Sequence, residues 1–455
     1  MLRFLHRKLS ADDIEAIETA VGELVEEHSE PQRILGVLKP LRRAARRQRE
    51  AAVSLIAVVN RQCLPPADAL ECVKPLREWY PDDLSLLAAL GEAAESLVDL
   101  NFLNAAAPTD PFLYTLVDDL ACAANDAVGT ADESDLLAGT ATAARMLGRQ
   151  RDDVAADAYQ RLVKLNPQGA ANHYNLGLFY KTRGRFEEGV RANQSARALS
   201  ATPVESYEWN LGICATGAGN GPLALEVWER MQQKIAMGRF ELPEGGYPQC
   251  KVRLAQRPLA ERSTDDDNPG HEETIWIERL SPCHGVVRSV LYADLGVDFG
   301  DVVLIDGAPI TYHRYGDSEV PVFPHLATLV HSGYRFYDFA GTQETTMQVE
   351  DASEDLQGDS VIYSHTERLE TICASCWRDP DLEHEHDEVS EENVVTGRIA
   401  APPSIEPADL LAQIDAAMEK RTPCRLFAPA LCRAAGQEER ARFEQRRFDV
   451  LAGAD

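Results

Sequence analysis

The stretch 170–203, AANHYNLGLFYKTRGRFEEGVRANQSARALSATP, decides the fold of the N-terminal half of this chain. It belongs to a series of alanine-rich amphipathic segments that runs to about residue 238, with few of the alternations typical of strands. With Ala170 as position 1, large and small residues stand at fixed places: Leu176 at 7, Gly177 at 8, Tyr180 at 11, Gly189 at 20 and Ala196 at 27. Such a series calls for a search for internal repeats.

The same spacing continues on both sides of this stretch. Units 136–169 and 205–238 keep the register, and so do earlier units at about 50–83 and 84–117. The matching residues are Ala155, Tyr159 and Pro167 upstream, Leu211, Gly212, Ala224 and Trp228 downstream, and Ala69, Pro81, Leu90 and Gly91 further back. Residues 99–135 break the period, so we expect an insertion or a degenerate unit there.

These units resemble the tetratricopeptide repeat (TPR), in which about 34 residues form a helix–turn–helix. The resemblance covers residues 1–240, about half of the chain, and His173 stands where the family often has tryptophan. It implies an α-solenoid, because no single unit can bury its apolar face alone. Within each unit, the glycine at position 8 and the small residue at position 20 let the two helices approach closely. The large residue at position 24 fills the space between them.

The TPR resemblance also implies a binding surface, because the first helix of each unit lines the concave face of the solenoid. In this family an asparagine at position 6 hydrogen-bonds the backbone of an extended peptide, and aromatic residues at position 5 offer it apolar surface. The candidate partner-binding residues are Tyr174, Asn175, Leu178, Lys181, Trp209, Asn210 and Ile213. Two alternatives stay open: these side chains pack against neighbouring helices or the second domain, or they only fill space. Lys181 has no convincing second basic residue for capture of a C-terminal carboxylate.

The C-terminal half has a different pattern and resembles no family that we identify. Residues 241–273 predict a linker, and residues 274–455 predict an α+β domain. Short runs rich in valine, isoleucine and tyrosine predict strands, and Asp306-Gly307 between two of them is a hairpin-type turn signal. Two later segments, 404–420 and 436–451, predict helices. The expected architecture is therefore an α-solenoid followed by an α+β domain.

One segment of the C-terminal half, TICASCWRDPDLEHEHDE at 371–388, combines cysteines, histidines and carboxylates. Zinc prefers about four cysteine or histidine ligands, and this segment supplies Cys373, Cys376, His384 and His386. A redox dithiol is a second interpretation, and a strand end followed by a solvated acidic loop is the third and favoured one. We expect no other cofactor and assign no catalytic residue: the adjacent Cys283 and His284 predict a turn leading into a strand.

Composition limits the classes of partner. The net charge of −29 disfavours nonspecific binding to nucleic acid and to anionic membranes. No apolar run is long enough to span a bilayer, and ten scattered cysteines do not form a secreted disulfide framework, so we expect a cytoplasmic, bacterial protein. A cluster of Arg42, Arg43, Arg46 and Arg47 predicts either contact with phosphate or an acidic partner, or a solvated face paired with the chain's own carboxylates.

These observations favour an adaptor that binds a peptide or a partner protein in the concavity of the solenoid, rather than an enzyme. The first alternative is an enzyme or sensor with a zinc-dependent site in the C-terminal domain, for which the repeats recruit the substrate. The second alternative is a subunit of a larger multiprotein assembly in which both halves are interfaces.

Overall fold

The computed structural model describes residues 8–98, 110–263, 266, 268–316, 318–373 and 389–453. The chain divides into two compact units, and each unit is assembled from separate stretches of sequence. The first contains residues 1–246, 257–270 and 304–327, and the second contains residues 247–256, 271–303 and 328–455.

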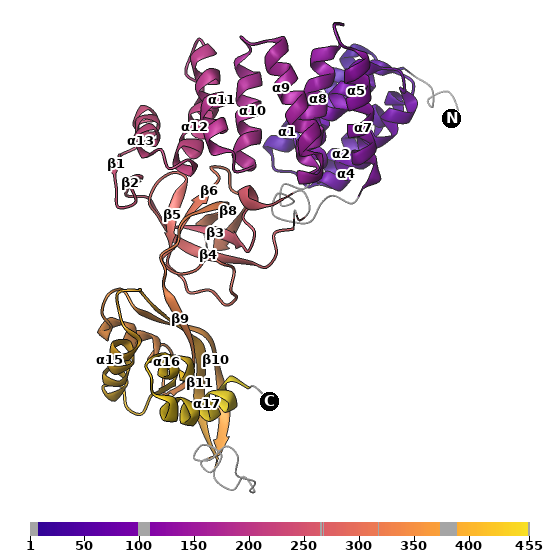
Figure 1. The fold of residues 1–455 in the computed structure, drawn as a ribbon. Coiled ribbons are helices and arrows are strands. Elements are labelled where there is room, and N and C mark those ends of the chain that lie inside the picture. The colour runs from indigo at the N-terminus through magenta and orange to yellow at the C-terminus, as the bar shows by residue number, and fades with distance from the viewer. Residues whose placement is uncertain are drawn as a thin grey trace. The chain divides into compact units, whose positions relative to one another are not determined.

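Helices make up the N-terminal half of the chain (Figure 1). Their bounds are α1 Ala11–Glu26, α2 Pro31–Ala45, α3 Arg49–Val59, α4 Pro66–Trp79, α5 Leu84–Glu92, α6 Ala94–Leu97, α7 Pro111–Asp126, α8 Glu133–Met146, α9 Asp152–Leu165, α10 Ala170–Thr182, α11 Phe186–Leu199, α12 Glu205–Gly217 and α13 Gly221–Arg230. The buried faces of α1 to α11 share one apolar core from Val21 to Ala192.

Helix pairs overlap four of the five predicted repeat units. Units 136–169, 170–203 and 205–238 overlap α8 with α9, α10 with α11, and α12 with α13, and unit 50–83 overlaps α3 with α4. The unit at 84–117 departs from this pattern, since α5 is followed by the short α6 and α7 begins only at Pro111.

Close approach within the helix pairs occurs at the predicted positions. A Cβ atom added to Gly212 would overlap the indole of Trp228, which is fully buried at position 24 of the same unit. A Cβ atom at Gly177 would overlap Asn193, which holds position 24 of unit 170–203, the unit that also contains Gly177. Glycine is required at these places because α10 and α12 each pass directly over a large side chain of the second helix.

Strands begin directly after the last helix pair (Figure 1). Their bounds are β1 Ile235–Met237, β2 Pro243–Gly245, β3 Cys250–Ala255, β4 Glu272–Arg279, β5 His284–Val287, β6 Val302–Ile305, β7 Thr311–Tyr315, β8 Ser318–Val330, β9 Arg335–Gln343, β10 Val361–Cys373, β11 Val389–Ala401 and β12 Arg425–Phe427. The range 241–273, predicted as a linker, thus contains β2, β3 and a 3-10 turn at Leu259–Glu261.

The strands β3 to β8 form a sheet in the order β3-β4-β5-β6-β8-β7, with an additional pairing of β3 with β8. The strand β8 therefore lies between β6 and β7, and it pairs with β7 in antiparallel register from Thr311 opposite Val322 to Tyr315 opposite Ser318. This order corrects the hairpin predicted at Asp306-Gly307. The turn connects two strands that are not neighbours, because the long β8 pairs with both of them.

A second sheet, in the order β10-β11-β9-β12, packs with three helices (Figure 1). Those helices are α15 Pro407–Glu419, α16 Pro429–Ala434 and α17 Glu438–Ala452. Alternate side chains such as Phe339 and Ile399 pack with Leu410 and Leu431 from these helices. Side chains of opposite parity, including Phe336 and Ala400, pack with Val290 and Phe299. This half combines sheets and helices, as expected of an α+β domain.

Among the described residues, no helix is both long enough and apolar enough to cross a bilayer.

Candidate functional site

The first helices of two successive units, α10 and α12, carry all seven of the predicted partner-binding residues. On α10, Asn175 is exposed, Tyr174 and Leu178 are half-buried, and Lys181 is buried. On α12, Trp209 is half-buried, whereas Asn210 and Ile213 are buried. We call these two helix faces the α10/α12 surface.

Lys181 is engaged within the chain. The residue is only 3% exposed, and its Nζ lies 2.9 Å from Oδ1 and 2.8 Å from Oδ2 of Asp306, at the turn between β6 and β7. A buried ammonium group is stable only when an opposite charge and hydrogen bonds replace its hydration. Asp306 supplies both, and the two residues are 125 positions apart in the sequence.

The neighbouring Gly307 packs against α12. A Cβ atom added to Gly307 would lie 3.0 Å from Cε3 of Trp209 and 3.6 Å from Cδ1 of Ile213. The Trp209 indole donates its Nε1 hydrogen to Glu205 at 3.3 Å and packs edge-on against Trp228, with ring centroids 5.2 Å apart. The turn therefore covers the part of the α10/α12 surface that contains Lys181, Trp209 and Ile213.

The two asparagines of this surface differ in exposure. Asn175 is exposed, and the ring of Tyr174 next to it packs on Tyr207 in a tilted arrangement with centroids 4.9 Å apart. Asn210 is only 5% exposed, and its Nδ2 has no hydrogen-bond acceptor within the described residues. A buried amide donor without an acceptor costs about 1–3 kcal/mol.

The sequence pattern does not single out three residues that shape this surface. Asp306 and Gly307 predict only a turn, and Tyr207 is not among the residues predicted to bind a partner. Tyr207 lies two residues before Trp209 on α12, so its helical position is a usable signal. Nothing in the local sequence indicates that Asp306 meets Lys181.

The arginine cluster at the end of α2 is exposed. Arg42 donates to the carbonyl of Glu71 at 3.2 Å, and Arg43, Arg46 and Arg47 are exposed. Within the described residues, no ion pair joins these four arginines to a carboxylate. The expected pairing with the chain's own acidic surface is therefore not found there, and Lys or Arg at the end of a helix is also favoured by the helix dipole.

The predicted zinc ligands fall where little is described. Cys376, His384 and His386 lie outside the described residues, and only the backbone of Cys373 is described, opposite Val389 at the end of β10. Elsewhere in the described chain, no group of three or more potential metal ligands is found. The zinc site stays a prediction.

A second group of potentially reactive side chains lies in the turn at 281–284, which leads into β5 as predicted. The Ser281 hydroxyl accepts hydrogen bonds from the backbone N–H groups of Cys283 and His284, at 3.1 and 3.2 Å. Its own hydrogen is therefore available to Nδ1 of His284, 2.5 Å away. All three residues are fully buried, and burial lowers the pKa of His284 to about 4. We interpret this group as a structural turn, because no substrate can reach it.

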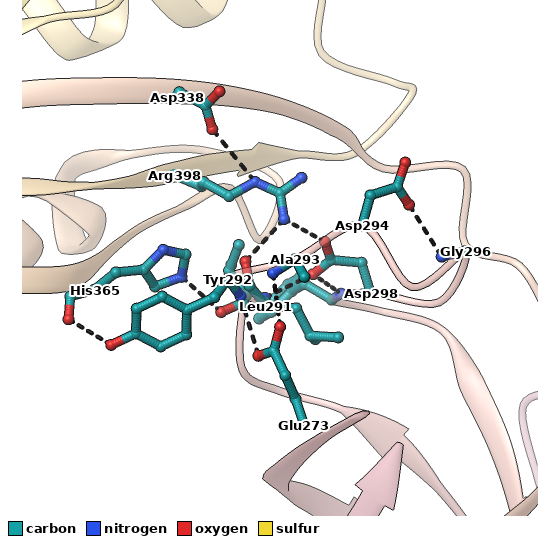
Figure 2. Close-up of polar contacts among 12 residues, drawn as sticks. Glu273, Leu291, Tyr292, Ala293, Asp294, Gly296, Asp298, Asp338, His365 and Arg398 are labelled. Carbon is teal, nitrogen blue, oxygen red and sulfur yellow. Dashed lines mark hydrogen bonds and ion pairs between the residues drawn. The ribbon is translucent and has the colours of Figure 1, made fainter. Parts of the chain in front are cut away.

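The polar cluster around Arg398 holds the loop between β5 and β6 (Figure 2). Arg398 Nη1 lies 2.7 Å from Oδ2 of Asp298 and 2.9 Å from the carbonyl oxygen of Leu291. Glu273 accepts from the backbone N–H groups of Tyr292 and Ala293, at 3.1 and 2.6 Å. Burial is the main cause that raises the pKa of Asp298, against the lowering effect of Arg398 and two backbone N–H groups. The carboxylates of Asp298 and Glu273 already pair with groups of the same chain. We therefore interpret the cluster as one that holds the loop between β5 and β6 in place.

The exposed side of the same cluster is aromatic. Tyr292 stacks on His365 with ring centroids 4.1 Å apart and donates its hydroxyl hydrogen to the His365 carbonyl oxygen at 2.5 Å (Figure 2). The register of β10 with β11 shifts between Ser364 and Thr366, so His365 is the bulged residue. The bulge turns its ring toward the loop, where Nε2 lies 2.9 Å from the carbonyl oxygen of Val290.

Comparison with known proteins adds little. No protein-family model and no curated protein matches the chain. Solved structures with some likeness include "MamA 41-end from Desulfovibrio magneticus RS-1", with 18% identity, a TM-score of 0.29, and coverage of 40% of this chain and 93% of that chain. Another, MamA AMB-1, has 15% identity, a TM-score of 0.29, and coverage of 40% and 87%. We base no inference on likenesses this low.

Proposed function

We propose that this protein is an interaction adaptor whose TPR-like helical half holds an extended segment of a partner protein against the α10/α12 surface. The observation that carries the proposal is the exposed amide of Asn175 beside the rings of Tyr174 and Tyr207, whose centroids lie 4.9 Å apart. A backbone N–H and a backbone carbonyl of a bound segment would pair with this amide. Asn210 holds the same repeat position in the next unit, and its buried Nδ2 has no acceptor within the described residues.

The chemistry of the surface fits a peptide better than a small substrate. Tyr174 and Tyr207 offer aromatic surface for apolar side chains, and the exposed amide of Asn175 can both donate to and accept from a peptide backbone. The net charge of −29 favours partners that carry basic or neutral segments elsewhere along the interface. We place this interaction in the cytoplasm of a bacterial cell.

The test is affinity purification of the full chain from its native host, followed by mass spectrometry. We expect the double variant Asn175→Ala with Asn210→Ala to lose most of the partner recovered by the wild-type chain. The variant Glu187→Ala is the control, since its side chain is 78% exposed on α11, the second helix of its unit. Circular dichroism verifies the fold of each variant. An identical partner list for the wild-type chain and the asparagine variant would disprove the proposal.

A further inference from the structure

The turn between β6 and β7 covers part of the α10/α12 surface, as a bound ligand would. Its contacts are made by one carboxylate and one glycine: Asp306 pairs with the buried Lys181, and Gly307 lies over Trp209 and Ile213. The Asp306 side chain is 17% exposed and the Lys181 side chain is 4% exposed, so a competing carboxylate reaches Lys181 only once the turn has moved away.

The backbone holds this turn only at its two ends. Asp306 N–H donates to the carbonyl of Pro324 at 3.3 Å, and Ile310 N–H donates to the carbonyl of Val322 at 2.8 Å. In the described chain, residues 307–309 have no backbone hydrogen bond to another segment. Because β8 separates β6 from β7, no hairpin ladder fixes the turn. The turn can therefore leave the α10/α12 surface without breaking a strand pairing.

The fit at Gly307 is selective for a small residue. A Cβ atom there would already be 3.0 Å from the Trp209 ring, so a side chain would push the turn away from α12. The surface thus recognises two features together: a carboxylate for Lys181 and, directly after it, a residue without a bulky side chain.

We infer that the Asp306-Gly307 turn is an internal ligand of the α10/α12 surface, and that a partner segment replaces it by presenting an acidic residue followed by glycine. This inference rests on the proposed function and adds to it the chemistry of the partner and a competing contact within the chain. Displacement exchanges one carboxylate on Lys181 for another, so the buried ammonium group remains paired throughout.

The experiment measures binding of a fluorescein-labelled peptide of residues 304–313, LIDGAPITYH, to the full chain by fluorescence anisotropy. We expect Asp306→Asn, which weakens the internal contact without changing its shape, to bind the peptide at least tenfold more tightly than the wild-type chain. Gly307→Val, which pushes the turn off Trp209 and leaves Lys181 unaltered, should bind it more tightly as well. The control Asp82→Asn removes an exposed carboxylate elsewhere and should leave the affinity unchanged.

Specificity is measured in the Asp306→Asn background. Adding Lys181→Met, or replacing the peptide's aspartate by asparagine, should weaken binding at least tenfold. If neither Asp306→Asn nor Gly307→Val binds the peptide more tightly than wild type while both remain folded, the turn is a permanent structural contact and the inference is wrong.

This outcome is separable from failure of the proposed function. If Asp306→Asn and Gly307→Val bind the peptide no more tightly than the wild-type chain, but the asparagine double variant loses its partner, only the inference about the internal ligand is wrong. If Asp306→Asn binds the peptide more tightly but the double variant Asn175→Ala with Asn210→Ala recovers the same partners as the wild-type chain, only the proposed function is wrong.

Discussion

At the scale of single residues, glycine decides how closely the helices of a unit pack. Gly177 and Gly212 hold position 8 of successive units, and each faces the position-24 side chain of its own unit. Gly36 on α2 is different, since a Cβ atom there would meet nothing within 4 Å. The same residue type therefore has opposite effects on stability at the two kinds of position.

We predict that Gly212→Ala destabilises the chain, because its methyl group would overlap the buried Trp228 indole. Overpacking of this kind costs about 1–3 kcal/mol. The matched control Gly36→Ala should instead stabilise by up to about 1 kcal/mol, the difference in helix propensity. Denaturant unfolding at neutral pH measures both, and a neutral or stabilising Gly212→Ala would show that α12 and α13 do not pack as described.

A second residue-scale prediction concerns His284. Burial lowers its pKa to about 4, below the ordinary value of 6.5, so the folded state binds its proton later than the unfolded state as pH falls. The stabilising effect of the neutral ring is complete above pH 6.5 and is lost between 6.5 and about 4. This loss amounts to roughly 3 kcal/mol at about 1.4 kcal/mol per pH unit.

The measurement is the free energy of unfolding from pH 7 to pH 4 for the wild-type chain and His284→Gln. The variant should be less stable at pH 7 and should lose stability less steeply on acidification. His271→Gln, which changes an exposed histidine, should retain the wild-type pH profile. Parallel profiles for wild type and His284→Gln would contradict the buried neutral ring.

At the scale of elements, the alternation of side chains along β9 and β11 assigns each residue to one face of the sheet. Odd-numbered residues such as Phe339 and Ile399 pack with α15 and α16. Even-numbered ones such as Phe336 and Ala400 pack with the 288–301 loop, and further along the same face Ala340 and Val394 pack with Leu451 of α17. Arg398 shares the even parity and lies directly opposite Asp338 in the ladder. Its guanidinium group therefore reaches the loop, and a register shift by one residue would turn it into the helical core.

We predict that Arg398→Met destabilises the second unit by about 3 kcal/mol, because it leaves Asp298 without its cation in a site where that carboxylate is 12% exposed. The double variant Arg398→Met with Asp298→Asn should recover part of this loss. Arg314→Met is the matched control: its pair with Glu319 is 81% and 51% exposed, so its removal should cost less than about 1 kcal/mol.

Amide hydrogen exchange measures the effect of losing the Arg398–Asp298 ion pair at single residues of the loop. The amides of Leu291 and Phe299 donate to Asp298 at 3.0 and 2.7 Å, so they should exchange faster in Arg398→Met. Equal exchange rates in wild type and variant would show that the loop is held by its apolar contacts and not by the ion pair.

At the scale of the whole molecule, the first unit is discontinuous in sequence. Its helical half continues into residues 257–270 and 304–327, and both stretches contact the repeat helices. Arg149, which is 4% exposed, donates to the carbonyl of Thr182 at 3.1 Å and also to that of Leu259. Gly221 at the start of α13 lies against the backbone of Glu241. Solenoids need such coverage, since the last repeat has no following neighbour.

Much of this fold follows from the sequence, because local periodicity encodes it. The helix pairs at 136–169, 170–203 and 205–238 follow from glycine, alanine and aromatic residues at fixed spacing, and most strands follow from valine- and isoleucine-rich runs. The seven partner-binding candidates lie on two adjacent helices for the same reason. Their availability to a partner does not follow from that spacing.

Only the tertiary structure decided which of those candidates are engaged. The sequence alone identifies Asp306-Gly307 as a turn and Lys181 as a position on the concave face, with no link between them. Their contact exists because β8 pairs between β6 and β7, which directs the turn toward α10 and α12 instead of closing a hairpin. Pairing between distant strands depends on the whole chain, so no local pattern contains it.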